Sequence, residues 1–148
     1  MKEIEQREEL KLSKQLCFPI YALAKDLAAA YRPLLEEIGL TYPQYLVLLV
    51  LWEQGEQRVS PLGEQLELDS GTLTPLLKRL AQKGLVLRER CTQDERNVWI
   101  KLTAEGQALR EKAIGIPAKL VSKLSLTTAE LLSLQTIIEK IRRDIHKN

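Results

Sequence analysis

The sequence predicts a mainly α-helical fold that contains one small β-hairpin. Three observations predict it. Apolar residues recur at every third or fourth position over long stretches, a tight polar turn separates two short helical segments, and two later runs alternate apolar and polar residues. With 148 residues the chain can bury a substantial core, and we expect a single domain over residues 1–148.

The first element is a long helix predicted over residues 12–38. Its apolar residues follow the period of a helix with one buried face: Leu16, Ile20, Leu23, Leu27, Tyr31, Leu34 and Ile38. If Ser13 caps the helix, Cys17 falls just past its first turn, whereas Pro19 fits better if the helix begins near Cys17. Either start leaves Cys17 close to the N-terminal end, and Pro33 is expected to bend or break the helix near its other end.

Three shorter helices follow. The second helix is predicted from about residue 41 to Gly55, with a proline in its first turn. Ser60 as N-cap and Pro61 at the first helical position are typical of the start of a third helix. A turn at residues 69–71 separates it from a fourth helix that ends at Lys83. Two short helices joined by a tight turn indicate a helix-turn-helix.

A β-hairpin is predicted directly after the fourth helix. Residues 85–91 and 98–102 alternate apolar and polar side chains, and the charged segment 92–97 lies between them. A hairpin in this place is typical of the winged variety of helix-turn-helix. We therefore expect a winged helix-turn-helix DNA-binding region over residues 41–103.

The C-terminal part is predicted to be helical again. Thr103 caps a helix that breaks near residues 115–117, and a final helix begins at Thr127 or Thr128. This final helix carries a narrow apolar seam, which suits packing against another helix: Leu131, Leu134, Ile138, Ile141 and Ile145.

The long first helix and the seamed last helix flank the winged centre. A helix that packs into its own domain could show the same seam. We favour a homodimer in which residues 13–39 and 117–148 form the dimerisation helices.

The composition excludes several classes of protein. The one histidine, His146, lies near the C-terminus, which disfavours a histidine-dependent catalytic site or a Cys/His zinc site, and there is no glycine-rich phosphate loop. We expect neither an enzyme nor a bound metal or cofactor. No apolar run approaches a membrane span and the charged N-terminus lacks a signal-peptide core, so a cytoplasmic location without membrane contact is expected.

The net charge of +2 is unevenly distributed. Residues 70–101 hold seven basic and three acidic side chains, whereas residues 1–69 hold seven basic and twelve acidic ones. A basic centre is what contact with DNA phosphates requires, although an ordinary solvated surface could carry the same local excess.

Cys17 and three tyrosines form the second candidate site. On one helix, Tyr21 and Tyr31 lie four and fourteen positions after Cys17 and return to nearly the same face, and Tyr42 follows on the next helix. A phenol can donate a hydrogen bond to a thiolate, and the thiolate is the form of cysteine that reacts with oxidants. The alternative is that Cys17 is a small buried hydrophobe.

The chain resembles the MarR family of winged-helix repressors, and within it the branch of organic-hydroperoxide regulators (OhrR) with their SarZ-like and MgrA-like relatives. The resemblance runs from about Ser13 to the end of the chain. The motifs that carry it most specifically are Leu16-Cys17-Phe18, residues 68–77 (LDSGTLTPLL) and Asp94-Glu95-Arg96-Asn97.

This resemblance implies a role for each candidate residue. Cys17 matches the sensor cysteine, and the tyrosines named above match the residues that hold its thiolate, some of them across the dimer. The recognition helix maps onto residues 70–83, and the wing arginine onto Arg96 with Asp94 as its partner. The residues expected to contact DNA or to supply positive charge to it are Ser70, Thr72, Thr74, Lys78, Arg88 and Arg96.

The second cysteine, Cys91, lies on the predicted wing strand and not in the C-terminal helical region, where two-cysteine members carry a resolving cysteine. The resemblance is therefore to one-cysteine members, in which a low-molecular-weight thiol caps the oxidised sensor. The implied function is a repressor that senses organic hydroperoxides through Cys17 and then releases double-stranded, pseudopalindromic operator DNA. The alternative is a regulator that responds to a small aromatic or phenolic ligand, with Cys17 only a core thiol.

Overall fold

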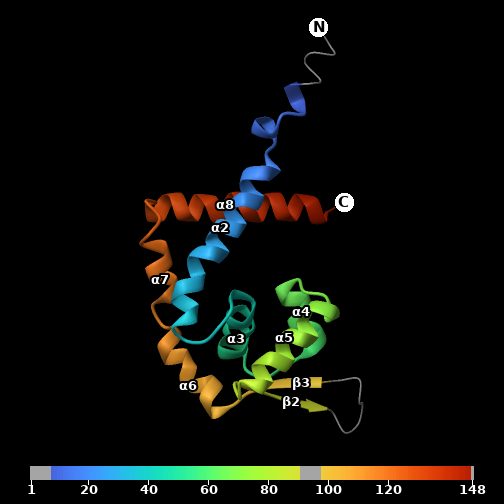
Figure 1. Ribbon diagram of the computed structural model, residues 1–148. Helices are drawn as coiled ribbons and strands as arrows, with labels where there is room; N and C mark the ends of the chain where they lie inside the picture. The colour runs from blue at the N-terminus through green and yellow to red at the C-terminus, as the bar shows by residue number, and fades with distance from the viewer. Residues whose placement is uncertain (1–7, 91–97, 148) are drawn as a thin grey trace. The chain divides into compact units, whose positions relative to one another are not determined.

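The computed structural model describes residues 8–90 and 98–147, and it confirms a mainly helical fold with a small antiparallel sheet (Figure 1). The chain divides into two compact units, one that runs to Ile114 and one from Gly115, and each is described by itself. The elements of the first unit are η1 (Leu12–Lys14), α2 (Cys17–Glu36), α3 (Tyr42–Gln54), β1 (Gln57–Arg58), α4 (Val59–Leu66), α5 (Ser70–Gln82), β2 (Val86–Arg90), β3 (Val98–Leu102) and α6 (Ala104–Ala113).

Helix α2 begins at Cys17, so the start that Pro19 favours is correct and a cap by Ser13 is not formed. Pro19 occupies the third helical position, where its missing N–H group would have had no partner within the helix. Pro33 lies inside α2, and the helix continues past it to Glu36.

A tight turn joins α2 to α3. Leu40 N–H donates to Leu35 O at 2.9 Å and Gly39 N–H to Glu36 O at 3.0 Å, while Gly39 takes a φ of +70°. This pattern satisfies the last carbonyl groups of a helix and favours glycine at the left-handed position. The turn therefore fixes the direction in which α3 leaves α2.

The helix-turn-helix is formed by α4 and α5. Helix α4 begins at Val59 with no side-chain cap, so the prediction that Ser60 caps it is wrong. Helix α5 begins at Ser70, where the Asp69 side chain accepts a hydrogen bond from Thr72 N–H at 2.8 Å. Figure 1 shows α3, α4 and α5 gathered on one side of the β2–β3 hairpin.

The predicted hairpin is present, and a third strand joins it. Strands β2 and β3 pair antiparallel with Arg88 opposite Ile100, and β1 pairs with the other edge of β3. Lys101 on β3 binds Glu56 at 3.3 Å and Glu89 at 2.7 Å, so its ammonium group links both neighbouring segments. Residues 91–97, among them Cys91, Asp94 and Arg96, lie outside the described residues.

The core of the first unit lies where the helices cover the sheet. Its largest fully buried side chains come from α2 to α5 and from β2 and β3: Leu35, Tyr45, Val47, Leu48, Leu51, Leu62, Leu73, Leu77, Leu80, Val86 and Ile100. Helix α6 is fastened to this core by Trp52, whose indole N–H donates to Gly106 O at 2.9 Å. A Cβ atom at position 106 would lie 2.0 Å from Leu85 O, so only glycine permits this approach.

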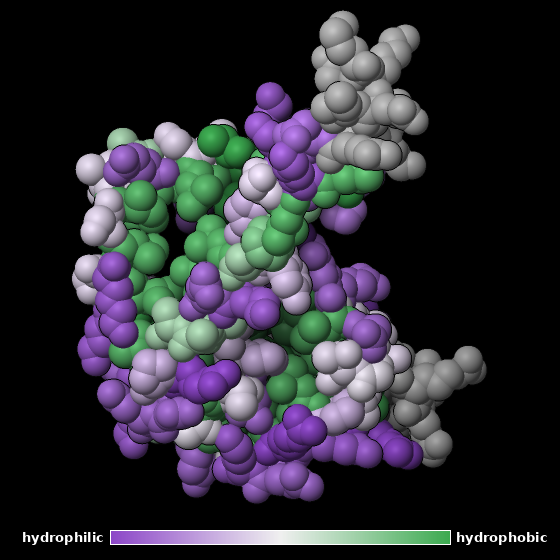
Figure 2. Space-filling model, turned by 45° about the horizontal axis from the view of Figure 1, so that its top comes forward, coloured by the Kyte–Doolittle hydropathy of each residue, from purple (hydrophilic) through white to green (hydrophobic). Residues whose placement is uncertain are grey.

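The second unit contains α7 (Ile116–Val121) and α8 (Thr128–His146). Gly115, with a φ of +88°, makes the predicted break before α7. Helix α8 begins at Thr128, one of the two predicted starts, and Thr127 caps it. No residue of α8 is buried, and its apolar stripe is open to solvent in the single chain: Leu134, Ile137, Ile138, Ile141 and Ile145. Figure 2 shows hydrophobic side chains, in green, gathered on the molecular surface. Among the described residues no helix is long and apolar enough to cross a lipid bilayer.

Candidate DNA-reading surface and thiol site

The first candidate site is the N-terminal end of α5. Leucines at positions 73, 76, 77 and 80 are buried and attach one face of the helix to the core. Ser70, Thr72 and Lys78 are exposed, and Thr74 is partly exposed. The Ser70 hydroxyl and the Lys78 ammonium are exposed donors suited to phosphate oxygens and base edges.

Asp69 fixes the start of this helix electrostatically. Its carboxylate accepts hydrogen bonds from Thr72 N–H at 2.8 Å and from Thr72 Oγ1 at 3.2 Å. These bonds stabilise the ionised form, and they lower the pKa of Asp69 below its ordinary value. The carboxylate therefore orients the Thr72 hydroxyl and satisfies an N–H group at the helix end.

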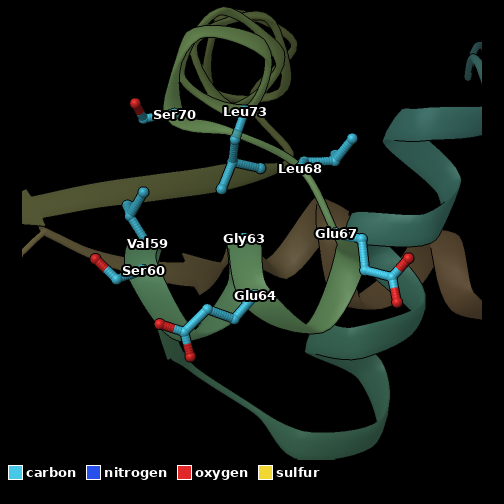
Figure 3. A pocket seen from close by; sticks show the side chains of 8 residues that line it. All are labelled: Val59, Ser60, Gly63, Glu64, Glu67, Leu68, Ser70 and Leu73. Atoms are coloured by element: carbon cyan, nitrogen blue, oxygen red, sulfur yellow. The ribbon is translucent and has the colours of Figure 1, made fainter. Parts of the chain in front are cut away.

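The packing of α4 against α5 depends on Gly63. Leu73 points from α5 toward Gly63 on α4 (Figure 3). A Cβ atom at position 63 would lie 2.9 Å from Leu68 O and 3.2 Å from Leu73 Cδ2. Beside this contact lies a hollow of about 370 Å³, lined also by Ser60 and Ser70 near the N-terminal ends of the two helices. Gly63 therefore sets how closely α5 approaches α4, a role that sequence reasoning missed.

Strand β2 adds exposed positive charge. Arg88 and Arg90 are exposed on it, and Lys78, Arg79 and Lys83 are exposed on α5 and at its end. The predicted wing contacts of Asp94 and Arg96 lie outside the described residues.

The second candidate site begins at Cys17, the first residue of α2. Its side chain is exposed, which does not fit a thiol packed in the core of its own subunit. Tyr21 lies one turn further along α2 and is 63% exposed. The Lys25 ammonium lies over the Tyr21 ring, 5.3 Å from its centroid, at a distance typical of a cation–π contact.

The other two predicted tyrosines lie together, but away from Cys17. The ring centroids of Tyr31 and Tyr42 are 4.8 Å apart, and the buried Tyr45 lies 6.0 Å from Tyr31. The site predicted from the sequence did not include Tyr45. Its spacing of three residues from Tyr42 on one helix could have indicated that it belongs there. Burial, with a smaller contribution from Tyr42, raises the pKa of Tyr31, so its phenol remains a hydrogen-bond donor at neutral pH.

The helix itself separates Cys17 from the Tyr31–Tyr42 pair. Fourteen residues of α2 at a rise of about 1.5 Å each place Tyr31 roughly 21 Å along the axis from Cys17. The prediction that Cys17, Tyr21 and Tyr31 share one face of a helix is compatible with the structure. Within one chain, however, only Tyr21 lies near the thiol.

A second hollow, of about 500 Å³, lies between α2 and the start of α3 in the first unit. Lys25, Arg32, Glu36 and Tyr42 supply its polar lining, and Ala28 and Ala29 supply small apolar side chains. Such a lining suits a small aromatic anion. The described residues contain no cluster of metal-ligating side chains.

Comparison with known proteins gives consistent matches over most of the chain. The family described as transcriptional regulator SarA/Rot matches residues 29–113. The organic hydroperoxide resistance transcriptional regulator of Bacillus subtilis is 44% identical over 140 residues, which cover 95% of each chain. The transcriptional regulator SarZ of Staphylococcus epidermidis is 39% identical over 141 residues, which cover 95% of this chain and 93% of that protein.

Solved structures of AbfR, a protein of Staphylococcus epidermidis, have a similar fold. Reduced AbfR bound to DNA superposes with a TM-score of 0.79 at 36% identity and 97% coverage of both chains. Overoxidized AbfR bound to DNA superposes with a TM-score of 0.78 at 37% identity, covering 99% of this chain and 98% of that one.

Proposed function

Since the chain belongs to the MarR-type family of transcriptional regulators that includes the organic-hydroperoxide and SarZ regulators, we propose that it is a redox-controlled repressor. The reduced protein binds double-stranded operator DNA, and oxidation of Cys17 releases it. The observation that carries this proposal is an exposed cysteine at the first position of α2, in the same compact unit as an exposed recognition-helix start.

In the DNA-bound state, the protein acts as a homodimer. The α5 helices of the two subunits enter adjacent major grooves, about 34 Å apart on a pseudopalindromic site. Ser70, Thr72 and Thr74 contact phosphates or base edges, while Lys78 and Arg88 supply positive charge. Arg96, with Asp94 beside it, enters the flanking minor groove. Reduced AbfR, which has a similar fold, is bound to DNA, and this supports DNA binding by the present chain.

Dimerisation would also complete the thiol site. Because Tyr31 lies roughly 21 Å along α2 from Cys17, it cannot hold the thiolate of its own chain. We assign that task to Tyr31 and Tyr42 of the partner subunit, with Tyr21 contributed by the same α2. The exposed apolar residues at the start of α2, and Leu16 just before it, support a second chain here, because surfaces of this kind are normally covered: Leu16, Phe18, Ile20 and Leu23.

The chemistry proceeds in two steps. The Cys17 thiolate attacks the terminal oxygen of an organic hydroperoxide, the O–O bond breaks, and with one proton the products are a sulfenic acid and an alcohol. A low-molecular-weight thiol then attacks the sulfenic sulfur, which gives a mixed disulfide and water.

We assign DNA release to the mixed disulfide. Its bulk separates the thiol from the tyrosines and repacks the dimer helices, which changes the spacing of the two DNA-reading helices. AbfR is found on DNA in an overoxidized form, so addition of oxygen atoms alone is compatible with DNA binding in that relative.

This proposal is tested by following the adduct and the DNA complex in one sample. The reduced protein is first bound to a duplex selected from a random-sequence library, and cumene hydroperoxide is then added with or without cysteine. We expect intact-mass analysis to show a cysteinyl adduct on Cys17, and fluorescence anisotropy to show DNA release in proportion to it. Adduct formation without release of DNA would contradict the proposal.

A second candidate function is favoured by the hollow between α2 and α3. Its cations and its tyrosine suit a small aromatic or phenolic ligand, which would control DNA binding without chemistry at Cys17. Salicylate distinguishes the two functions: DNA release by salicylate that persists in Cys17→Ser would favour ligand control.

A further inference from the structure

Lys83 ties the recognition helix to the turn between α2 and α3. Lys83 is the residue directly after the last turn of α5, and its ammonium donates to the backbone oxygen of Gly39 and to Gln44 Oε1, the latter at 3.1 Å. The two acceptors lie 44 and 39 residues earlier in the chain. One exposed side chain therefore joins the DNA-reading helix to the entrance of α3.

The two acceptors belong to the hydrogen-bonded turn between α2 and α3. Gln44 is 3% exposed, and its Oε1 atom also accepts from Thr41 N–H at 3.1 Å. The carbonyl of Gly39 stands at the C-terminal end of α2, where partial negative charge favours a cation. A buried amide oxygen thus receives one hydrogen bond from the start of α3 and one from the end of α5.

The same turn carries the tyrosine pair. Tyr42 follows Thr41 directly and is the first residue of α3, and its ring lies against Tyr31 on α2. A change in the packing of these rings would move the backbone at Thr41 and the Gln44 side chain, which is bonded to it. Lys83 would pass that movement to the end of α5.

We propose that Lys83 is a positioning residue that couples the Tyr31–Tyr42 pair to the recognition helix through Gln44. The inference rests on the proposed function in that it takes α5 as the DNA-reading helix. Apolar packing of α3 against α5 holds the two helices together, as the buried Leu48, Leu77 and Leu80 indicate. Removal of the exposed Lys83 head group therefore leaves the core intact and releases only the polar link.

The test is a double-substitution cycle on reduced protein. Lys83→Met keeps the aliphatic stem and removes the donor, Tyr42→Ala removes the ring from Tyr31, and the third variant carries both changes. Affinity for a library-selected duplex is measured by anisotropy, and thermal unfolding serves as a check on folding. Each variant changes the dissociation constant for DNA by some factor. If Lys83 couples the two sites, the factor of the double variant should differ from the product of the two single factors by about threefold or more. For unlinked sites, the double factor equals that product to within roughly twofold.

Two further measurements separate positioning from direct contact. A lysine that contacts a phosphate contributes about one unit to the salt dependence of DNA binding, so Lys83→Met should leave that slope unchanged. Lys83→Arg, which keeps a donor, should restore at least half of the lost affinity. Lys112→Met on α6, an equal change of charge at an exposed site, should bind DNA like the wild type.

Two results would overturn the inference. One is a double variant whose change in DNA affinity equals the product of the two single changes. The other is a salt dependence of DNA binding that is shallower by about one unit in Lys83→Met than in the wild type. The response of the wild type to cumene hydroperoxide with cysteine is recorded in the same series. A non-multiplicative cycle in a protein that ignores the oxidant would contradict the redox function and support the coupling. An oxidant-sensitive protein with a multiplicative cycle would contradict the coupling alone.

Discussion

Tyr31 on α2 stacks against Tyr42 on α3 with their ring centroids 4.8 Å apart, although eleven positions separate them in the sequence. The contact brings one phenol from each of the two helices together as a pair. The pair lies roughly 21 Å along α2 from the thiol of its own chain, so a shared site requires a second chain. The arrangement leads to predictions about reactivity, folding and assembly.

Tyr42→Phe should slow oxidation of Cys17 without unfolding the protein. The substitution keeps the ring against Tyr31 and removes only the hydroxyl that we assign to the partner's thiolate. A hydrogen bond to a charged group is worth about 1.5–3 kcal/mol, so the rate of sulfenic acid formation should fall roughly tenfold or more. The measurement is trapping with dimedone, followed by mass spectrometry. Tyr45→Phe is the matched control, and an equal rate in both variants would remove Tyr42 from the site.

Asp69→Asn should alter the pH dependence of stability. Hydrogen bonds from Thr72 hold the pKa of Asp69 below its ordinary value of 3.8. Because the folded-state pKa is lowered, this stabilisation is present above the unfolded pKa and is lost as the pH falls through the folded value. Asparagine still caps the helix but does not titrate.

Urea unfolding at pH 7 and at pH 3 measures this effect. The loss of stability on acidification should be smaller in Asp69→Asn than in the wild type. The control is Asp144→Asn, which removes an exposed carboxylate of α8 that caps no helix. Between pH 7 and pH 3 this variant should lose as much stability as the wild type. If Asp69→Asn also loses as much as the wild type, the cap does not contribute to acid stability.

Gly106→Ala should destabilise the first unit strongly. The added methyl would lie 2.0 Å from Leu85 O, and a shift of α6 would break the hydrogen bond from Trp52 to Gly106 O. Overpacking of this kind costs about 1–3 kcal/mol, and the lost bond adds to it. The check is the free energy of unfolding in urea, with Gln107→Ala at the next, exposed position as control. Equal stability of the two variants would show that the approach of α6 to Leu85 is not tight.

Charges on the apolar stripe of α8 should produce monomers. Leu134 and Ile138 are 38% and 45% exposed in the single chain, and burial of this remaining surface between subunits contributes about 1 kcal/mol each. Glutamate at both positions should raise the dimer dissociation constant roughly 100-fold or more. Sedimentation velocity measures this, and Thr136→Glu with Arg143→Glu, on the opposite face of α8, is the control. A wild-type monomer would contradict the dimer itself.

Local chemistry made much of this fold predictable. Thr103 caps its helix and the last helix begins at Thr128, both as expected. Gly115 takes the left-handed conformation at the expected break, and the alternation after residue 85 marks β2. Strand β1 could not be predicted, because two residues are too few to show alternation. The start of α4 was placed two residues late, because Ser60 and Pro61 are typical of a cap that this helix does not use.

The sites were harder to predict than the elements. The spacing of Cys17, Tyr21 and Tyr31 predicts one face of α2, and the continuous helix is compatible with this, but a helical projection carries no information about separation along the axis. The links from Lys83 to Gln44 and from Trp52 to Gly106 join residues 39 and 54 positions apart, and these contacts follow from tertiary packing alone. The roles assigned to Cys91, Asp94 and Arg96 stay predictions.

We propose that Cys17 alone makes DNA binding sensitive to oxidants. The most direct test of this proposal is DNA affinity before and after cumene hydroperoxide with cysteine, measured for the wild type, Cys17→Ser and Cys91→Ser on the same selected duplex. Serine keeps the size of the thiol but cannot form a sulfenic acid or a disulfide. We predict that the wild type and Cys91→Ser lose affinity and that Cys17→Ser binds as tightly after treatment as before. Release of DNA by Cys17→Ser, or a response lost in Cys91→Ser alone, would contradict the account.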